Sequence, residues 1–446
     1  MSNKAGEGKS EKGSGGLVPR LRFPGHFGDE DWKLIKICEI GYILGGLSGK
    51  SAVDFVCGSP YVTYRQVFSQ AKIDFSACDK VTIAVDETQN TLQKGDIIFT
   101  GSSETPEEVG ISSVVVDDVG FPVYLNSFCF ILRPGSMATL LPSFSMYLFQ
   151  SPQYRASVTA IAQGSTRFNL SKSAFRELSV SLPEKVSEQD KIADCLSSID
   201  DLITLESQKL NALKTHKKGL MQQLFPAEGE TVPRLRFPEF GGAGEWYERE
   251  LGPLTTKVGS GITPTGGDKN YKTKGRPFVR SQNVGWGELI LNDVAFIDEE
   301  THQSFDSTEI KVSDVLLNIT GASIGRSAVA DSRIVGGNVN QHVCIIRAQQ
   351  VELNPALLNH FLISERGQKQ IDSFQAGGNR QGLNFAQIRS FVIPLPPTEH
   401  EQRMIATCLA SLDDLITAQT QKLNALKAHK KGLMQQLFPN PELSNL

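Results

Sequence analysis

The chain of 446 residues contains no apolar run that approaches the roughly 20 residues needed to cross a bilayer. Its first segment, residues 1–16, is rich in Gly, Ser and Lys and lacks the apolar core of a secretory signal. We therefore expect a cytoplasmic protein with no membrane partner, in which residues 1–16 form a disordered lead-in.

Cysteine and histidine are few and follow no metal-binding pattern. The seven cysteines form an odd count without a CxxC pair, and Cys195 and Cys408 are equivalent positions of a repeat. Reduced, buried thiols explain this usage better than disulfides or a metal site. The seven histidines also lack metal-ligand spacing. We expect no metal site in this chain.

Enzyme motifs are missing as well. The tripeptide GKS occurs twice, but a Walker loop needs a glycine five residues before its second glycine, where Asn3 and Leu44 stand. The Asn/Asp-Pro-Pro-aromatic tetrapeptide of a methyltransferase is absent, and no carboxylate–lysine cluster suggests a nuclease. We expect no catalytic residue and no cofactor in this chain.

Positive charge is not in excess, because the net charge is −4. The overall electrostatics therefore make no case for nucleic acid, and any DNA-binding face must be local. Hydrophobic residues at 39% and charged residues at 21% are typical of a globular protein.

What the chain does contain is a segment that occurs twice. Asp200–Pro226 and Asp413–Pro439 lie 213 residues apart, and only four of their 27 aligned positions differ. Isoleucine and leucine recur in each at alternating spacings of three and four, which is typical of a coiled coil. Each run follows a proline and ends at Leu-Phe-Pro, where proline stops a helix. We expect helices about 60 Å long within residues 184–226 and 397–439.

The charge pattern predicts how these helices pair. Acidic residues gather early in each helix and lysines gather late. In an antiparallel pair the acidic end of one helix meets the basic end of the other, whereas a parallel pair brings like charges together. The same polarity also suits each helix dipole. We expect an antiparallel two-helix coiled coil with a pseudo-twofold relation between the halves.

The regions before the helices align more loosely. The motif VPRLRFP opens each of them, and Trp32 and Trp246 follow at the same offset. Short β-branched runs indicate strands that correspond between the halves: Pro60–Val67 with Pro277–Val284, Asp96–Gly101 with Asp314–Gly321, and Asn126–Arg133 with Asn340–Arg347. We predict an α+β chain with two α/β domains in tandem, residues 17–183 and 227–396, each followed by one helix, and a tail at residues 440–446.

The order of domain, repeated helix, divergent domain and repeated helix resembles the specificity (S) subunit of type I restriction–modification enzymes. The motifs that carry the resemblance are QKLNALK(T/A)HKKGLMQQLFP, EQDKIADCLSSIDDLI with its partner EQRMIATCLASLDDLI, VPRLRFP, and DVLLNITGASIGRSAV in the second domain. The first domain departs from the family at Thr100–Gly110, which is longer and more acidic than Thr320–Gly325.

The resemblance implies two target-recognition domains, each of which reads one half of a split site in double-stranded DNA. It implies that the helices set the distance between the domains and dock two modification (methyltransferase) subunits. S-adenosylmethionine, ATP and Mg²⁺ would belong to partner subunits, and restriction/translocase subunits would join through the complex. A protein-binding scaffold or adaptor with two recognition domains on a coiled-coil spacer is the alternative function.

Loops that mix glycine with forked or amide side chains are the candidates for contact with DNA. A guanidinium suits guanine and an amide suits adenine, while glycine lets the backbone approach phosphates. The strand candidates are Arg280, Gln282 and Asn283, with their counterparts Tyr64, Arg65 and Gln66. The loop candidates are Gly164 and Arg167, with their counterparts Asn379, Arg380 and Gln381. Lys272, Lys274 and Arg276 form a basic stretch suited to backbone contact. For any single residue, a solvated surface or turn is the alternative.

The helices are more alike than their seam requires, because a two-helix seam constrains only about two residues in seven. The candidates for partner docking are equivalent pairs on the two helices: Asn211, His216, Lys217, Lys218 and Gln222 with Asn424, His429, Lys430, Lys431 and Gln435. Two identical surfaces predict two copies of one partner. Recent duplication without selection is the alternative, although the domains have diverged and the helices have not.

Overall fold

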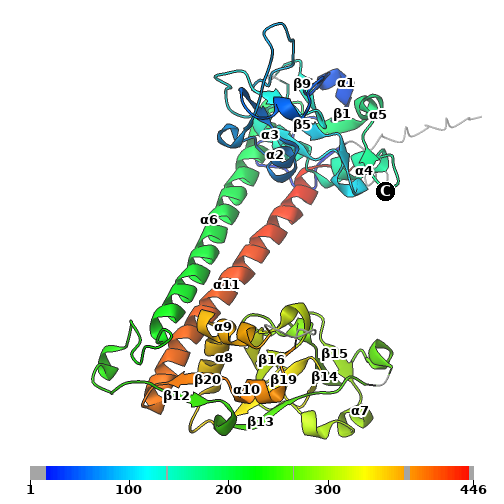
Figure 1. Cartoon of the computed structure of the whole chain (residues 1–446). Helices are drawn as coiled ribbons and strands as arrows, with labels where there is room; N and C mark the ends of the chain where they lie inside the picture. Colours follow the sequence, from blue (N-terminus) through cyan, green and yellow to red (C-terminus); the bar gives the residue numbers. More distant parts are fainter. Residues whose placement is uncertain (1–16, 137–138, 265, 376–381, 441–446) are drawn as a thin grey trace, which may run out of the picture. The chain divides into compact units, whose positions relative to one another are not determined.

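The computed structural model describes residues 17–136, 139–264, 266–375 and 382–440 (Figure 1). The expected lead-in at residues 1–16 and the tail beyond residue 440 lie outside this range. The chain divides into two compact units, the first made of residues 1–205 and 422–446 and the second of residues 206–421. None of the described helices is long and apolar enough to cross a membrane.

Two helices of 39 residues each, α6 (Val186–Leu224) and α11 (Glu399–Leu437), occupy the segments with the heptad pattern. Each unit contains part of both helices. In the first unit, the Lys430 ammonium lies 2.6 and 2.8 Å from the two carboxylate oxygens of Asp200. In the second unit, Lys217 Nζ lies 2.5 Å from Asp413 Oδ1. Late residues of one helix thus meet early residues of the other, so the two helices run antiparallel within each unit (Figure 1).

Each unit is built around a four-stranded sheet in which all neighbouring strands are antiparallel. In the first unit the order is β2 (Gly41–Gly45), β9 (Cys129–Pro134), β5 (Ile97–Thr100) and β7 (Ser112–Val114). In the second unit it is β13 (Thr255–Ser260), β19 (Val343–Ala348), β16 (Val315–Asn318) and β17 (Ser327–Val329). The central strands β5 and β16 are buried along their whole length, because each lies between two apolar clusters. This explains the three consecutive apolar residues with which each strand begins.

Smaller sheets repeat between the units. One is a mixed sheet of three strands. In the first unit its order is β4 (Asp79–Val81), β3 (Ser59–Val62) and β8 (Tyr124–Leu125). In the second unit its order is β15 (Ala295–Ile297), β14 (Arg276–Val279) and β18 (Asn338–Val339). The other pairs β1 (Lys33–Lys36) with β11 (Ser179–Leu182), and β12 (Tyr247–Glu250) with β20 (Val392–Leu395). The first unit also pairs β6 (Ser102–Ser103) with β10 (Phe168–Asn169). The α+β class predicted from the sequence is confirmed.

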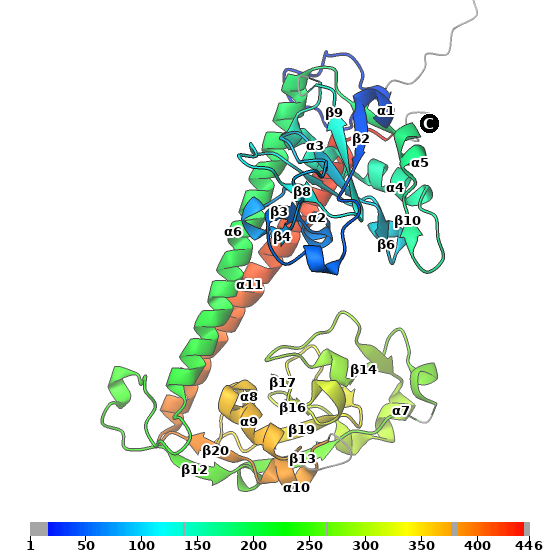
Figure 2. The same ribbon diagram turned by 45° about the horizontal axis from the view of Figure 1, so that its top comes forward.

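Short helices complete each unit. The first unit contains α1 (Ile37–Ile40), α2 (Tyr64–Ser69), α3 (Pro142–Leu148), α4 (Pro152–Ala160) and α5 (Lys172–Glu177). The second contains α7 (Glu299–Gln303), α8 (Pro355–Ile363), α9 (Glu365–Ser373) and α10 (Phe385–Arg389). Within the second unit, α8 and α9 lie between the long helices and the four-stranded sheet (Figure 2).

Two predicted strands are shorter than expected, and their ends carry candidate site residues. The strand predicted at Pro60–Val67 ends at Val62, where α2 begins. The one predicted at Pro277–Val284 ends at Val279 and continues as a 3₁₀ turn, Ser281–Asn283. Capping amides cause both changes: the Gln66 side chain accepts from the Thr63 N–H at 3.0 Å, and the Asn283 side chain accepts from the Arg280 N–H at 3.0 Å.

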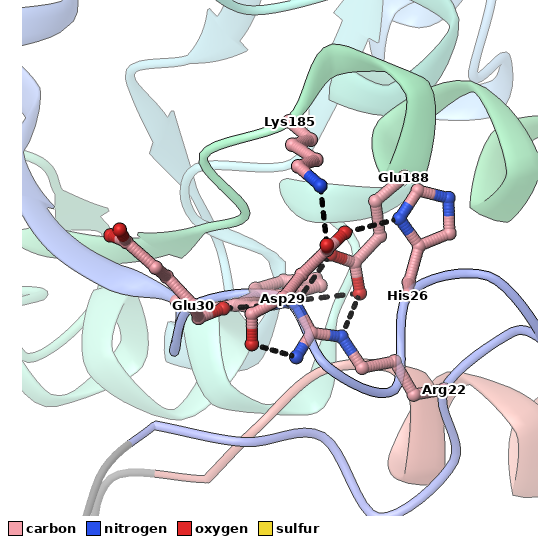
Figure 3. Close-up of polar contacts among 7 residues, drawn as sticks. Arg22, His26, Asp29, Glu30, Lys185 and Glu188 are labelled. Carbon is pink, nitrogen blue, oxygen red and sulfur yellow. Dashed lines mark hydrogen bonds and ion pairs between the residues drawn. The ribbon is translucent and has the colours of Figure 1, made fainter.

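The repeated VPRLRFP motif fastens each domain to a long helix. In the first unit, Arg22 Nε and Nη2 each donate to the Glu188 carboxylate at 2.8 Å (Figure 3). Trp32 Nε1 donates to the same carboxylate at 3.3 Å. In the second unit, Arg236 and Trp246 contact Glu401 at 2.7, 2.8 and 3.2 Å in the same way. Both glutamates are almost fully buried in the first turns of α6 and α11.

The far ends of the long helices are held to the same motif. Leu21 N–H donates to Gln436 O at 3.0 Å in the first unit, and Leu235 N–H donates to Gln223 O at 3.0 Å in the second. Phe438 packs between Trp32 and Phe144, with ring centroids 6.0 and 5.6 Å away. The start of the first domain is therefore attached to the end of α11 as the start of the second domain is attached to the end of α6.

Candidate nucleic-acid interface

Two of the predicted DNA-contacting residues of the first unit, Tyr64 and Arg167, both bond to Ser102 of β6. Tyr64, at the start of α2, donates its hydroxyl to Ser102 O at 2.8 Å. Arg167 Nη2 donates to Ser102 Oγ at 3.1 Å, and the guanidinium lies 5.3 Å from the centre of the Phe128 ring. Burial raises the pKa of the Tyr64 phenol, so the hydroxyl stays protonated and remains a donor. The fold thus joins residues that are about a hundred positions apart in the sequence.

The exposed Arg167 side chain is held by its neighbours. Gly164 has a φ of +145°, and a Cβ there would lie 2.1 Å from Arg167 O, so the turn between Gln163 and Asn169 requires glycine. Phe128 is 55% exposed and supports the face of the guanidinium. A forked donor supported by an aromatic ring suits a base edge or a phosphate.

Arg65 and Gln66, the other two candidates on α2, differ in their exposure. Arg65 is exposed and lies next to Tyr64 on α2. Gln66 is only 7% exposed, and its side-chain amide caps α2 and donates to Asp74 O at 3.1 Å. The Gln66 amide is therefore used within the fold, and its contact with DNA stays a prediction.

In the second unit, Arg280 and Gln282 gather around Asp293. Arg280 Nη2 donates to Asp293 O at 2.7 Å and lies 3.3 Å from its carboxylate, while its guanidinium stands 5.3 Å from the Tyr271 ring centre. Gln282 Nε2 donates to the same carboxylate. Asn283 is 1% exposed, and its amide donates to Ile290 O at 2.9 Å. The Asn283 amide, like that of Gln66, is used within the fold, and its contact with DNA stays a prediction.

The basic stretch of the second unit is largely neutralised by nearby acids. Lys272 lies 3.4 Å from Asp298, and Arg276 Nε donates to Glu299 at 2.9 Å. This hydrogen bond raises the pKa of Arg276. Lys274 is exposed and, among the described residues, has no carboxylate within 4.0 Å. The stretch therefore offers phosphates one unpaired charge rather than three.

The predicted counterparts of the Arg167 turn, Asn379, Arg380 and Gln381, lie outside the described residues. Gly382, the residue that follows them, is described. It forms an isolated antiparallel bridge with Thr320, as β10 pairs with β6 in the first unit. Thr320 Oγ1 lies 2.5 Å from His342 Nδ1.

Sequence reasoning missed Phe128 and His342, which occupy equivalent places. Each follows a capping asparagine by two residues, and Asn126 and Asn340 accept from their N–H groups at 2.9 and 3.0 Å. Both lie inside runs that the sequence alignment of the two halves had already matched. An aromatic or imidazole ring two residues after asparagine, just before a buried strand, was the available signal.

The docking candidates divide into exposed residues and seam residues. Those exposed on α6 and α11 are Asn211, His216, Lys218 and Gln222, and Asn424, His429, Lys431 and Gln435. Lys217 and Lys430 are instead engaged with Asp413 and Asp200 within their own units. Their ammonium groups pair across the seam, and a contact of these two lysines with a partner stays a prediction.

His26, Asp29 and Glu188 are the only described acidic or histidine groups close enough together to hold a metal ion. Their charges are already matched by cations (Figure 3). Arg22 takes both oxygens of Glu188, and Asp29 contacts Lys185 and lies 2.6 Å from His26 Nδ1. The hydrogen bond from Lys185, followed by that from His26, lowers the pKa of Asp29. The geometry is that of an ion-pair network at the domain–helix joint.

Comparison with known proteins defines the family. The sequence model of one protein family, described as "Type I restriction modification DNA specificity domain", matches residues 29–215 and again residues 244–428. These matches cover most of the chain and repeat once, as the two units do. The chain belongs to the family of type I restriction–modification DNA specificity domains.

Relatives and solved structures agree with this assignment. The putative type I restriction enzyme MjaX specificity subunit of Methanocaldococcus jannaschii is 25% identical over 420 residues, which cover 92% of this chain and 93% of the relative. The MjaVIII specificity subunit of the same organism is 24% identical and covers 66% and 69%. The solved S subunit of a type I system from M. genitalium superposes with a TM-score of 0.59 at 15% identity, covering 95% of this chain and 99% of that one. The fold is therefore shared along nearly the whole length.

Proposed function

We propose that this chain is the non-catalytic subunit that selects the DNA sequence for a type I restriction–modification complex. Each domain, at residues 17–183 and 227–396, reads one half of an asymmetric, bipartite site in double-stranded DNA. An arginine–aromatic contact found in both units carries this proposal. Each unit presents an arginine on an aromatic ring, Arg167 on Phe128 and Arg280 on Tyr271, within the same architecture but among different polar neighbours.

The different neighbours support different half-sites. Arg167 stands beside a hydroxyl and has no carboxylate within 4.0 Å among the described residues, so its fork suits guanine O6 and N7 or a phosphate. Arg280 stands beside the exposed carboxylate of Asp293, which suits the cytosine amino group. A bound base pair would replace the contacts that Arg280 and Gln282 make with Asp293.

We further propose that α6 and α11 form an antiparallel coiled-coil spacer that fixes the gap between the half-sites. A helix of 39 residues is about 60 Å long at 1.5 Å per residue. The Lys217–Asp413 and Lys430–Asp200 pairs support a pseudo-twofold relation, because each residue of one pair lies 213 positions from its counterpart in the other.

Two modification subunits dock on this spacer, one on each copy of the exposed helix face. S-adenosylmethionine, ATP and Mg²⁺ are used by the modification and restriction/translocase subunits. The exposed, repeated residues of α6 and α11 support a 2:1 assembly, because two like surfaces accommodate two copies of one partner. Native mass spectrometry with the cognate modification subunit should show two copies per chain. Lys218→Glu should weaken the binding of one copy and Lys431→Glu that of the other. One copy at saturation, or unchanged binding by the double variant, would overturn the 2:1 assembly.

Methylome sequencing of a host with and without the gene tests the function itself. We expect adenine methylation at a motif of two unlike parts separated by a gap of constant length, and we expect it to disappear when this chain is deleted. An uninterrupted motif, or methylation that persists without the chain, would contradict the proposal.

A further inference from the structure

The second unit contains a cavity of about 820 Å³ beside the late part of α6. Its walls come from α6, from the first turn of α9 and from the loop that carries Trp286. The apolar part includes Phe225, Ile363 and Trp286. Trp286 is 54% exposed, although a large indole is ordinarily covered. A sizeable hollow with a partly bare aromatic wall therefore lies next to the helix face proposed for docking.

The loop holds Trp286 in a defined place. Val284 and Leu289 bridge across its base, and Gly287 N–H donates to Ser327 O at 2.8 Å. Gly287 has a φ of +92°, and a Cβ there would lie 3.1 Å from Ile363 Cδ1. The loop tip thus packs closely on the end of α8. The exposed indole is positioned by a tight, glycine-dependent turn.

The cavity is positively charged. Six cationic side chains and two carboxylates line it. Three of the cations already have partners: Lys217 pairs with Asp413, Arg366 with Glu248, and Lys369 with Glu365 at 2.9 Å. The other three, Lys214, Lys218 and Arg234, are exposed and have no carboxylate within 4.0 Å among the described residues. Uncompensated positive charge beside an apolar wall fits an anionic ligand that also carries an apolar group.

The surroundings of the corresponding helix end in the first unit are different. Counted from the capping residues Gln66 and Asn283, the position of Trp286 is taken by Ser69. Arg366, which donates to Pro226 O at 3.2 Å, corresponds to Gln153, which donates to Phe438 O at 2.9 Å. The hollow beside Phe438 measures about 290 Å³ and is lined by no charged side chain. The helix faces are alike, but their surroundings are not.

We propose that the cavity of the second unit binds an acidic segment with an apolar side chain, contributed by one of the two modification subunits. The two subunits are then held by unequal contacts, one with the Trp286 cavity and one without it. This inference rests on the proposed docking of modification subunits. It adds the chemistry of the docking segment and an asymmetry that the repeated helices alone do not predict.

A protein segment fits the cavity better than duplex DNA does. The backbone of a duplex offers phosphates and sugars, and its bases are stacked, so it has no apolar group to cover an exposed indole. Stacking on a tryptophan requires an unpaired base. Lys218 and Gln222 also belong both to the cavity and to the exposed face of α6, which makes the cavity continuous with the proposed interface.

The chain provides its own reporter for this contact. Of its three tryptophans, Trp32 and Trp246 are 2% and 3% exposed, so Trp286 is the one that acrylamide can quench. The difference between the native protein and Trp286→Phe isolates its signal from tryptophans of the partner. We expect the cognate modification subunit to reduce the quenching of Trp286 several-fold. A DNA duplex added without that subunit should leave the quenching unchanged.

Affinities measured with the same modification subunit complete the test. Trp286→Ala and Arg234→Glu should each weaken the binding of one copy by about tenfold and leave the second copy unaffected. The matched control Ser69→Ala, at the corresponding position of the first unit, should change neither.

Unchanged affinities, or equal weakening of both copies, would overturn the inference while leaving the docking proposal intact. Loss of DNA binding by Trp286→Ala with partner binding preserved would assign the cavity to DNA and also overturn it. If the native protein bound no modification subunit at all, the docking proposal would fail and this inference with it.

Discussion

The two units attach their domains to the long helices in the same way, but a different residue stands beside the Lys–Asp pair that joins the two helices in each unit. The joints are repeated: Arg22 and Trp32 hold Glu188 as Arg236 and Trp246 hold Glu401. Beside the Lys430–Asp200 pair stands Tyr147, whereas beside the Lys217–Asp413 pair stands His360. The Arg, Trp and Glu groups that hold each domain on the helices are thus repeated, whereas the residue beside each Lys–Asp pair is not.

Tyr147 and His360 hold the same place, five residues after Pro142 and Pro355, but they behave differently. The Tyr147 hydroxyl donates to Asp200 at 3.0 Å, and burial raises the pKa of its phenol. His360 is buried, and its Nδ1 has no hydrogen-bond partner among the described atoms. Burial, aided by the nearby Lys217 ammonium, lowers the pKa of His360 to about 3. His360, beside the Lys217–Asp413 pair, is therefore a group that acid protonates unfavourably, and Tyr147 at the equivalent place in the first unit is not.

The largest effect should come from breaking a repeated joint. Glu188→Ala leaves the Arg22 guanidinium buried without its carboxylate, which we expect to lower the free energy of unfolding of the first unit by about 3–5 kcal/mol. Glu401→Ala should do the same to the second unit through Arg236. Urea unfolding measures the two losses, followed through Trp32 in protein that lacks Trp246 and Trp286, and through Trp246 in protein that lacks Trp32 and Trp286. A loss below about 1 kcal/mol in either unit would show that the joint does not hold the domain.

The next effect concerns pH and separates the two units. His360 has a lowered pKa in the folded protein, so its contribution is fully present above the unfolded pKa of about 6.5 and is lost as the pH falls from there toward 3. Between pH 7 and pH 5 the second unit should lose about 2 kcal/mol from this group. His360→Tyr should remove that loss, and Tyr147→His should introduce it in the first unit. Equal acid sensitivity of the native protein and His360→Tyr would contradict this assignment.

The repeat made the fold largely predictable, because a heptad pattern and two prolines mark α6 and α11 without reference to the rest of the chain. Apolar runs marked β5, β9, β16 and β19 for a similar reason: central strands buried on both faces leave an unbroken apolar signature. Their neighbours at the sheet edges have no such pattern. The placement of the short strands depended on contacts that no local pattern encodes.

The candidate site was less predictable, because its residues meet only in the fold. Tyr64 and Arg167 were chosen separately by residue type, and Ser102 brings them together. Gln66 and Asn283 were chosen by the same criterion and instead cap turns, since an amide three residues into a turn bonds the backbone. An amide side chain can contact a base edge or cap a helix or turn, so residue type alone does not distinguish these two roles.

A smaller effect should distinguish the two recognition surfaces from each other. Arg167→Ala should weaken binding of the assembled complex to its site about tenfold and relax the sequence requirement in one half only. Arg280→Ala should do so in the other half. Arg167→Lys, which keeps the charge but loses the fork, should retain salt-dependent binding and still relax that half. Binding to libraries randomised in one half at a time measures these changes. Relaxation of both halves by a single variant would contradict separate readers.

The smallest effect is expected from moving the chain ends. Leu21 N–H already donates to Gln436 O, so the start of the first domain meets the end of α11 in the first unit as Leu235 meets Gln223 in the second. A permutant that joins Pro439 to Leu17 through a short flexible linker and opens near Glu228 should change the free energy of unfolding by less than about 1 kcal/mol. Thermal unfolding and DNA binding measure the outcome. Failure of the permutant to fold would contradict this closure.

Exchange of one domain tests the central claim, that each unit reads its own half-site on a common scaffold. Residues from about Val18 to Pro183 are replaced by the same region of a family member with a different target, and the host methylome is sequenced. The account predicts one new half-motif, with the other half and the gap length unchanged. A simultaneous change of both halves, or an altered gap, would contradict it.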